Sequence, residues 1–159
     1  MLTPDTTPST TAASAEAGSA AGRTRAPFDA TLLPLILVVD DMVETRRLMR
    51  RVLERDRFRV IEAATGEEAL RAIRSSQPAL VVLDLRLPGM SGFEVAQEVR
   101  ASPDPAVANT ILLACTASVQ SEVRSEALEA GCDDFEGKPF DIRTFAARVR
   151  GVIERGRRS

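Results

Sequence analysis

Short apolar runs alternate with amphipathic segments along most of this chain, and this alternation limits the folds open to it. The runs lie at Leu35–Asp40, Phe58–Ala63, Leu80–Asp84, Thr110–Ala114 and around Phe135. Each is followed by a segment whose apolar residues recur at helical spacing. Continuous apolar strands that alternate with amphipathic helices are typical of a parallel sheet covered on both faces. The sequence therefore predicts an α/β domain of five βα units.

The predicted helices are defined by their apolar faces and end signals. Thr65 is expected to cap the second helix, with Glu68 completing a capping box. Ser118 is expected to open the fourth helix and Gly131 to end it, while Pro103-Asp104-Pro105 predicts a chain break. In chain order the five faces consist of Val43, Leu48, Met49, Val52 and Leu53; Ala69, Leu70 and Ile73; Phe93, Ala96 and Val99; Val119, Val123, Ala127 and Leu128; and Ile142, Phe145, Ala146, Val149 and Ile153.

The chain has 159 residues, which is enough for one domain and a tail. Residues 1–31 are rich in Thr, Ser, Ala and Pro and poor in large apolar residues, so we expect a disordered tail. A docking or targeting arm is the alternative role for this segment. The domain is expected at residues 32–155, and residues 156–159 are expected to fray.

Composition excludes several classes of function. The absence of histidine excludes Ser-His-Asp catalysis and nearly every zinc site. A net charge of −2 and the absence of Trp and Tyr argue against nucleic-acid binding. No apolar run is long enough to span a membrane. Cys115 and Cys132 lie in or beside apolar segments, as expected for small core residues of a reduced, cytoplasmic protein.

Charged side chains follow three of the apolar runs. Asp40 and Asp41 end the first run, Asp84 ends the third, and Lys138, the only lysine in the chain, follows the fifth. The carboxyl ends of parallel strands share one edge of a sheet, which is where open α/β sheets bind ligands. Gathered carboxylates repel one another unless a cation joins them, and oxygen ligands favour Mg²⁺. The pattern therefore predicts a metal-dependent carboxylate site suited to phosphoryl chemistry.

Each of these side chains also has a plainer interpretation. The paired aspartates could be helix N-caps, which is a common use of Asp. Asp84 could be a turn residue, Thr116 could cap the helix after the fourth strand, and Lys138 could be a solvated surface lysine. Their joint occurrence at strand ends favours the shared site.

Five motifs occur in order on the predicted elements: Val38-Val39-Asp40-Asp41, Leu83-Asp84, Pro88-Gly89-Met90-Ser91-Gly92, Ala114-Cys115-Thr116-Ala117 and Lys138-Pro139-Phe140. Because of these motifs, the chain resembles the receiver domain of two-component response regulators. The resemblance extends from about Leu35 to Arg155. The resemblance implies a flavodoxin-like (βα)5 fold, doubly wound, with a five-stranded parallel sheet in the strand order 2-1-3-4-5.

The resemblance also implies roles for the residues that match its motifs. Asp84 would be the phosphoacceptor. Asp40, Asp41 and Asp84 would hold Mg²⁺ together with the backbone carbonyl of Arg86. Phosphoryl transfer places charge on equatorial oxygens, so a metal, an ammonium and a hydroxyl around them are the main catalytic need.

Thr116 and Lys138 would contact the phosphoryl oxygens, and the Lys138-Pro139 bond would be cis. Thr116 and Phe135 would form the switch, in which Phe135 fills space that Thr116 leaves. The sequence departs from the family pattern at Met42, where an acidic residue is frequent. It departs also at Phe135, where Tyr is frequent, and at Glu136-Gly137, where Gly137 is expected to loosen the approach to Lys138.

The implied partners are a histidine kinase or histidine phosphotransfer protein and a downstream protein target, with no nucleic acid or membrane. The chain is expected to be a stand-alone switch, a monomer or a phosphorylation-linked dimer, that catalyses only its own phosphorylation and dephosphorylation. A binding-only receiver is the alternative. An aspartate-nucleophile phosphohydrolase fits poorly, because Arg86 stands two residues after Asp84 where its second Asp would be. A flavin carrier fits poorly too, since Asp40 and Asp41 would repel a phosphate.

Overall fold

The structure, a computed structural model, describes residues 32–158, so the predicted disordered tail lies outside the described residues. The strands are β1 (Leu35–Val39), β2 (Arg59–Ala63), β3 (Leu80–Leu83), β4 (Leu112–Thr116) and β5 (Asp134–Gly137). The helices are α2 (Val43–Arg55), α3 (Gly66–Ser76), α4 (Gly92–Arg100), α5 (Pro105–Ala108), α6 (Ser121–Ala130) and α7 (Phe145–Arg158). Among residues 32–158, no helix combines the length and apolar composition needed to cross a membrane.

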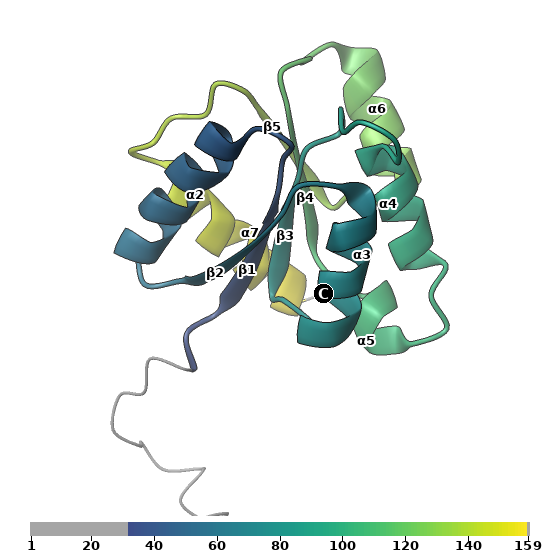
Figure 1. Ribbon diagram of the computed structural model, residues 1–159, viewed down its shortest axis with the longest axis horizontal. Coiled ribbons are helices and arrows are strands. Elements are labelled where there is room, and N and C mark those ends of the chain that lie inside the picture. Colours follow the sequence, from purple (N-terminus) through teal and green to yellow (C-terminus); the bar gives the residue numbers. More distant parts are fainter. Residues whose placement is uncertain (1–31, 159) are drawn as a thin grey trace, which may run out of the picture. The chain divides into compact units, whose positions relative to one another are not determined.

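The five strands form one parallel sheet in the order β2-β1-β3-β4-β5, which confirms the predicted fold (Figure 1). In the central pair, Val39 of β1 is the register partner of Leu83 of β3. The next residue on each strand is therefore an aspartate, Asp40 or Asp84, and the two stand side by side at the carboxyl edge of the sheet. Thr116 and Gly137 are partners at the same edge of β4 and β5.

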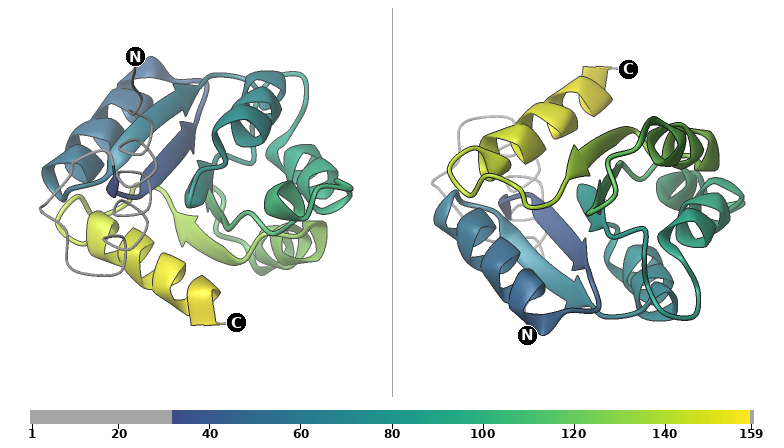
Figure 2. Two further views of the ribbon diagram at one scale, coloured as in Figure 1. Left: turned by 90° about the horizontal axis from the view of Figure 1, so that it is seen from below. Right: turned by 90° about the horizontal axis from the view of Figure 1, so that it is seen from above.

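Helices cover both faces of the sheet (Figure 2). Helices α2 and α7 lie on one face, where Ile36 and Val38 of β1 are buried with Met49 and Phe145. Helices α3, α4 and α6 lie on the other, and that layer buries alternate strand residues such as Leu37. Both sides of the central strands are thus apolar, as the continuous apolar runs predicted.

Both cysteines are buried, which confirms their prediction as core residues. Burial raises the pKa of the Cys115 thiol to about 12 and that of Cys132 to about 11. Neither thiol is ionised near neutral pH, so neither is a nucleophile in the folded chain.

Several element boundaries differ from the sequence predictions. Strand β4 begins at Leu112 rather than Thr110, because Thr110 belongs to the turn that closes α5, where its hydroxyl donates to the Ala106 carbonyl at 3.4 Å. That short helix occupies the predicted break, and Asp104 caps it. Helix α6 begins at Ser121 rather than Ser118. Helix α7 continues to Arg158, so it includes three of the four residues expected to fray.

Some residues assigned to buried helix faces are exposed. Val119 and Ile142 precede their helices and are 65% and 53% exposed, and Leu128 is 44% exposed. Val43 and Leu48 of α2 are also partly exposed, while Met49 and Leu53 form its buried face. Val119 and Ile142 are exposed because α6 and α7 begin after them, so neither residue lies on a helix face that packs on the sheet.

The predicted cap of α3 is present in a modified form. The Thr65 hydroxyl accepts a hydrogen bond from the Glu68 backbone N–H at 3.1 Å. The Glu68 carboxylate, however, accepts from the backbone N–H of Ala64, one residue before the cap, at 2.7 Å. A second capping box, between Ser91 and Glu94, starts α4 beside the carboxyl edge of β3.

Candidate functional site

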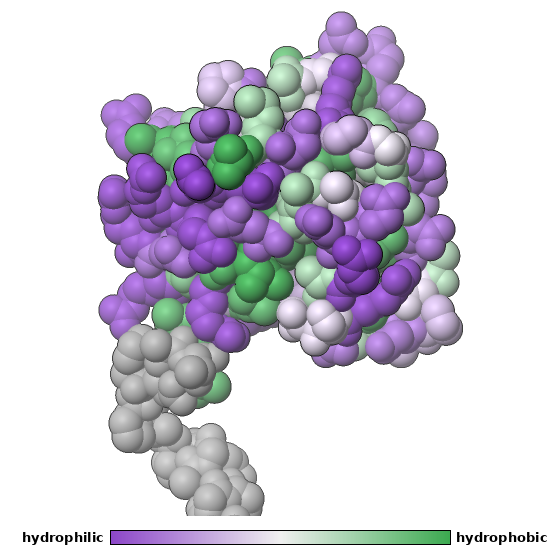
Figure 3. Space-filling model, in the orientation of Figure 1, coloured by the Kyte–Doolittle hydropathy of each residue, from purple (hydrophilic) through white to green (hydrophobic). Residues whose placement is uncertain are grey.

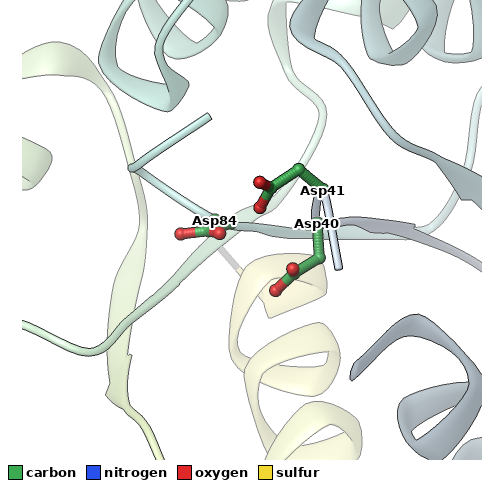
Figure 4. Close-up of side chains that lie close together, drawn as sticks. All are labelled: Asp40, Asp41 and Asp84. Carbon is green, nitrogen blue, oxygen red and sulfur yellow. The ribbon is translucent and has the colours of Figure 1, made fainter. Parts of the chain in front are cut away.

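The three predicted carboxylates meet at the carboxyl edge of the sheet (Figure 4). Asp40 and Asp41 follow β1 and Asp84 follows β3, and one oxygen from each lies within 4.8 Å of the others. Asp40 and Asp84 are buried, whereas Asp41 is exposed. The cluster is thus anchored in the sheet and open to solvent on the side of Asp41.

Asp40 is held on three sides. Its Oδ1 accepts a hydrogen bond from the Met42 backbone N–H at 2.9 Å, and its backbone carbonyl accepts from Arg46 Nη1 at 2.7 Å. Its Oδ2 accepts from Lys138 Nζ at 2.6 Å. A carboxylate that is only 1% exposed needs such partners, because burial of an unpaired charge is costly.

Asp84 is held more loosely than Asp40. Its Oδ1 accepts from the Arg86 backbone N–H at 3.0 Å, and its Oδ2 lies 3.4 Å from Lys138 Nζ. Burial raises the pKa of this carboxyl above its ordinary value, although the Arg86 hydrogen bond and the charge of Lys138 oppose that rise. Helix α4 begins directly beside this residue: a Cβ at Gly92 would lie 2.4 Å from the Asp84 carbonyl oxygen, so this close approach requires glycine.

Lys138 reaches the carboxylates from the end of β5. Its backbone N–H donates to the Thr116 carbonyl at 2.8 Å, and the Lys138-Pro139 bond is cis, as the resemblance implied. Burial alone would lower the pKa of this ammonium, but the hydrogen bond with Asp40 and the charge of Asp84 raise it. Lys138 is therefore a permanent cation that bridges two of the three carboxylates. A Cβ at Gly137 would lie 2.7 Å from Cγ1 of Val119, an exposed side chain.

The two predicted switch residues are both buried. Thr116 is fully buried at the end of β4, and its hydroxyl lies 3.5 Å from the Ser118 backbone N–H. The Phe135 ring on β5 is 6% exposed, with the Arg124 guanidinium 5.6 Å from its centroid. The ring therefore lies inward, within the buried cluster on the side of α3, α4 and α6.

A groove opens beside the carboxylates, between the loop after β3 and helix α6. Its volume is about 530 Å³. It is lined by Asp41, Leu85, Arg86, Leu87, Pro88, Ser91, Phe93, Val123 and Glu126. The groove gives the exposed side of the cluster direct access to an incoming molecule.

The donor set fits a hard divalent cation. Three carboxylates face one ammonium, which leaves surplus negative charge at a site whose ligand atoms are all oxygen. Carboxylate and carbonyl oxygens are the ligands that Mg²⁺ takes in proteins. Asp40, Asp41 and Asp84 offer carboxylates, and the loop after Asp84 carries the Arg86 carbonyl.

Residues that the sequence did not point to also shape the site. Arg46 fixes the Asp40 carbonyl, and Arg148 donates to the Phe135 carbonyl at 2.8 Å and to Glu136 Oε1 at 2.9 Å, which orients β5. The position of Gly92 could be suspected from the sequence, since it ends a loop dense in turn residues. Arg46 and Arg148 could not be singled out, because arginine occupies every basic position but one.

Comparisons with known proteins match this chain to one family over most of the described domain. Residues 36–150 match the sequence profile of the response regulator receiver domain. The chain is 39% identical over 120 residues to "Probable transcriptional regulator ycf27" of Porphyridium aerugineum, covering 76% of this chain and 48% of that protein. It is 36% identical over 127 residues to "Transcriptional regulatory protein ResD" of Bacillus subtilis, covering 80% and 51%. The chain thus spans about half the length of these relatives.

A solved structure shares both the fold and part of the sequence. A putative response regulator from Chloroflexus aurantiacus superposes with a TM-score of 0.71 at 30% identity, covering 77% of this chain and 98% of that one. The likeness extends over nearly all of the described domain.

Proposed function

Because this chain belongs to the response regulator receiver domain family, we propose that Asp84 accepts a phosphoryl group from a phosphohistidine in a Mg²⁺-dependent reaction. The observation that carries the proposal is the cluster of three carboxylates within 4.8 Å, two of which contact Lys138. Receiver domains are signalling switches, and they typically bind Mg²⁺ at an acidic pocket.

Asp40, Asp41, Asp84 and the Arg86 carbonyl would hold the ion. When bound, Mg²⁺ would supply positive charge for the phosphoryl oxygens. The chain's own contribution is to fix these ligands: the Met42 N–H orients Asp40, and the Arg86 N–H orients Asp84. Asp41 has no hydrogen bond to any residue in the described part of the chain, which leaves it available as a ligand.

Transfer requires an ionised Asp84. One of its oxygens attacks phosphorus, the new O–P bond forms, and the N–P bond of the phosphohistidine breaks with its electrons returning to the imidazole. Lys138 favours the charged form of Asp84 and stands where it would pair with a phosphoryl oxygen. The Thr116 hydroxyl would donate to another. No general base is needed, so the absence of histidine is compatible with this chemistry.

The phosphohistidine would belong to a histidine kinase or a histidine phosphotransfer protein. Output would pass through a protein partner on the face formed by α6, β5 and α7, where Glu122 and Glu126 are exposed. Arg143 is exposed too, but it lies beside Val52 and Arg55 of α2. In the proposed switch, the phosphoryl group draws the Thr116 hydroxyl from Ser118, and the buried position of Phe135 is thereby stabilised. The names of the relatives describe action on transcription, which belongs to those longer proteins.

The proposal is tested by intact-protein mass after incubation with Mg²⁺ and acetyl phosphate, with Asp84→Asn as the matched variant. A gain of one HPO₃, about 80 Da, is expected only in the wild type and is expected to disappear with EDTA, since the carboxylates need the cation. An adduct on Asp84→Asn would contradict the assignment of the acceptor. Wild type that gains no mass and releases no phosphate from acetyl phosphate would instead indicate a binding-only receiver.

A further inference from the structure

Helix α2 carries an exposed row of unpaired arginines, which we call the basic ridge. The basic ridge consists of Arg47, Arg51 and Arg55. All three are exposed, and none of their guanidinium groups has a hydrogen bond or ion pair with a residue in the range 32–158. Their neighbours on the same helix differ: Arg46 and Arg50 pair with Glu62 at 3.0 and 2.6 Å. Helix α2 thus carries both paired and unpaired arginines, and the three of the basic ridge are unpaired.

Helix α6 carries a row of the opposite sign, which we call the acidic ridge. The acidic ridge consists of Glu122, Glu126 and Glu129. All three are exposed. Within the described chain, the only hydrogen bond that their carboxylates accept is donated by the Ser121 hydroxyl to Glu122, at 3.4 Å. Arg124, the one cation of this helix, is directed to the Phe135 ring instead. The acidic ridge therefore lacks an intramolecular counter-charge.

The two ridges each contain three charges and are similar in length. Residues three or four apart share one helix face, so the members of each ridge lie in a row. Glu44 and Glu54 border the basic ridge on α2, and Glu54 pairs with Arg50. At about 1.5 Å per residue, the basic ridge spans about 12 Å and the acidic ridge about 10 Å.

The ridges lie on opposite sides of the sheet, since α2 covers one face and α6 the other (Figure 1, Figure 2). In Figure 3 the region over α2, at the left, is dominated by hydrophilic side chains. The ridges of one molecule therefore cannot neutralise each other. The ridges of two molecules can meet, and the net charge of only −2 adds little overall repulsion between copies.

We propose that the basic ridge of one copy docks on the acidic ridge of a second copy. The contact is heterologous, because it joins two different surfaces. Each pair of molecules leaves one ridge of each kind unused, so association continues into short chains rather than closing as a symmetric dimer. The contact does not depend on the phosphoryl chemistry of Asp84.

Exposed ion pairs are individually weak, which determines the conditions of association. The Debye length is about 30 Å at 0.01 M ionic strength and about 3 Å at 1 M, so the contact is strong only at low salt. Docking also covers α6, the helix that follows Thr116, and copies of the chain would then compete with any partner that binds this helix.

Sedimentation equilibrium of the full chain tests the proposal. At an ionic strength of about 0.01 M the weight-average mass is expected to rise with protein concentration, and at about 0.5 M it should return to that of the monomer. Two neutralised variants isolate the ridges: Arg47→Gln/Arg51→Gln/Arg55→Gln and Glu122→Gln/Glu126→Gln/Glu129→Gln. Glutamine is a good helix former and all six positions are exposed, so both variants should fold, which circular dichroism checks.

Neither variant is expected to associate alone. An equimolar mixture of the two retains one intact basic and one intact acidic ridge, so it should form a dimer that does not grow further. The control Arg71→Gln/Arg74→Gln/Arg157→Gln removes the same charge from exposed positions elsewhere and should associate like the wild type. A monomeric wild type at low salt, a single-ridge variant that still associates, a mixture that stays monomeric, or a control that loses association would each overturn the proposal.

Discussion

Two charged clusters in this domain differ in the balance of their charges. One surrounds Arg100, whose guanidinium donates to the carbonyls of Gly131, Ala108 and Thr110 at 2.9, 2.7 and 2.7 Å. It also donates to Asp133 Oδ2 at 2.8 Å. One cation meets one carboxylate and three carbonyls, so every partner is satisfied within the chain. This cluster fastens α4 to the segments before β4 and β5.

The other cluster is the carboxylate site, where Asp40, Asp41 and Asp84 face only Lys138. The protein leaves this surplus of negative charge uncompensated, although the Arg100 cluster shows that the same chain can satisfy its charges fully. A balanced cluster indicates a structural role, whereas a charge surplus at a strand edge indicates a ligand of opposite sign. Substitutions at the two clusters should therefore change the free energy of unfolding in opposite directions.

The largest effect is expected at the balanced cluster. Arg100→Ala should lower the free energy of unfolding by about 3 kcal/mol, because it leaves three carbonyls without this donor. It also removes one of the two donors to Asp133 Oδ2, the other being the Leu112 backbone N–H. Urea denaturation measures this loss. Arg71→Ala removes an exposed arginine from α3 and should change stability by less than about 0.5 kcal/mol. Equal effects of the two substitutions would mean that the Arg100 contacts contribute nothing.

A smaller effect of opposite sign is expected at the carboxylate site. Without Mg²⁺, Asp84→Asn should raise the free energy of unfolding, since burial disfavours the charged carboxylate. The pKa of Asp84 is higher in the folded state than in the unfolded state. The ionised group is therefore a destabilising one, and the gap between variant and wild type should narrow as pH falls through that raised pKa. A destabilised Asp84→Asn at pH 7 would show that this carboxylate is structural.

The smallest effect is expected at a second balanced cluster, where Glu62 pairs with Arg46 and Arg50, and Glu54 also pairs with Arg50. The hydrogen bond from Arg50 holds the pKa of Glu62 below its ordinary value despite partial burial. The stabilisation is present at neutral pH and is lost as pH falls through the lowered pKa. Glu62→Gln should thus cost about 0.5–1 kcal/mol at pH 7 and nothing at a pH below that pKa. A cost that does not change with pH would remove the ionic explanation.

The sequence predicted the sheet and the placement of the site because both follow from local patterns. Apolar runs mark buried parallel strands, and the residues just after them, Asp40, Asp84 and Lys138, must gather at one edge. Position along a strand was enough to identify them.

Other features depend on contacts between distant segments, which no local pattern contains. The start of β4 is set by pairing Leu112 with Val81 of β3, and this register left Thr110 to a turn. Arg100 and Asp133 stand 33 residues apart, and nothing near either predicts their contact. The inward position of Phe135 likewise depends on packing among several elements.

The central claim is that the charge surplus at the sheet edge binds a divalent cation. Asp41 isolates this claim, because it is exposed and has no hydrogen-bonding partner among residues 32–158. Asp41→Asn should therefore match the free energy of unfolding of the wild type within about 0.5 kcal/mol in the absence of metal.

The most direct measurement is the free energy of unfolding of both proteins across a Mg²⁺ titration, with Glu67→Gln as a control for loss of an exposed carboxylate. At tenfold excess over the dissociation constant, Mg²⁺ should stabilise the wild type and Glu67→Gln by about 1.4 kcal/mol and leave Asp41→Asn largely unchanged. Equal stabilisation of all three proteins, or of none, would contradict the account.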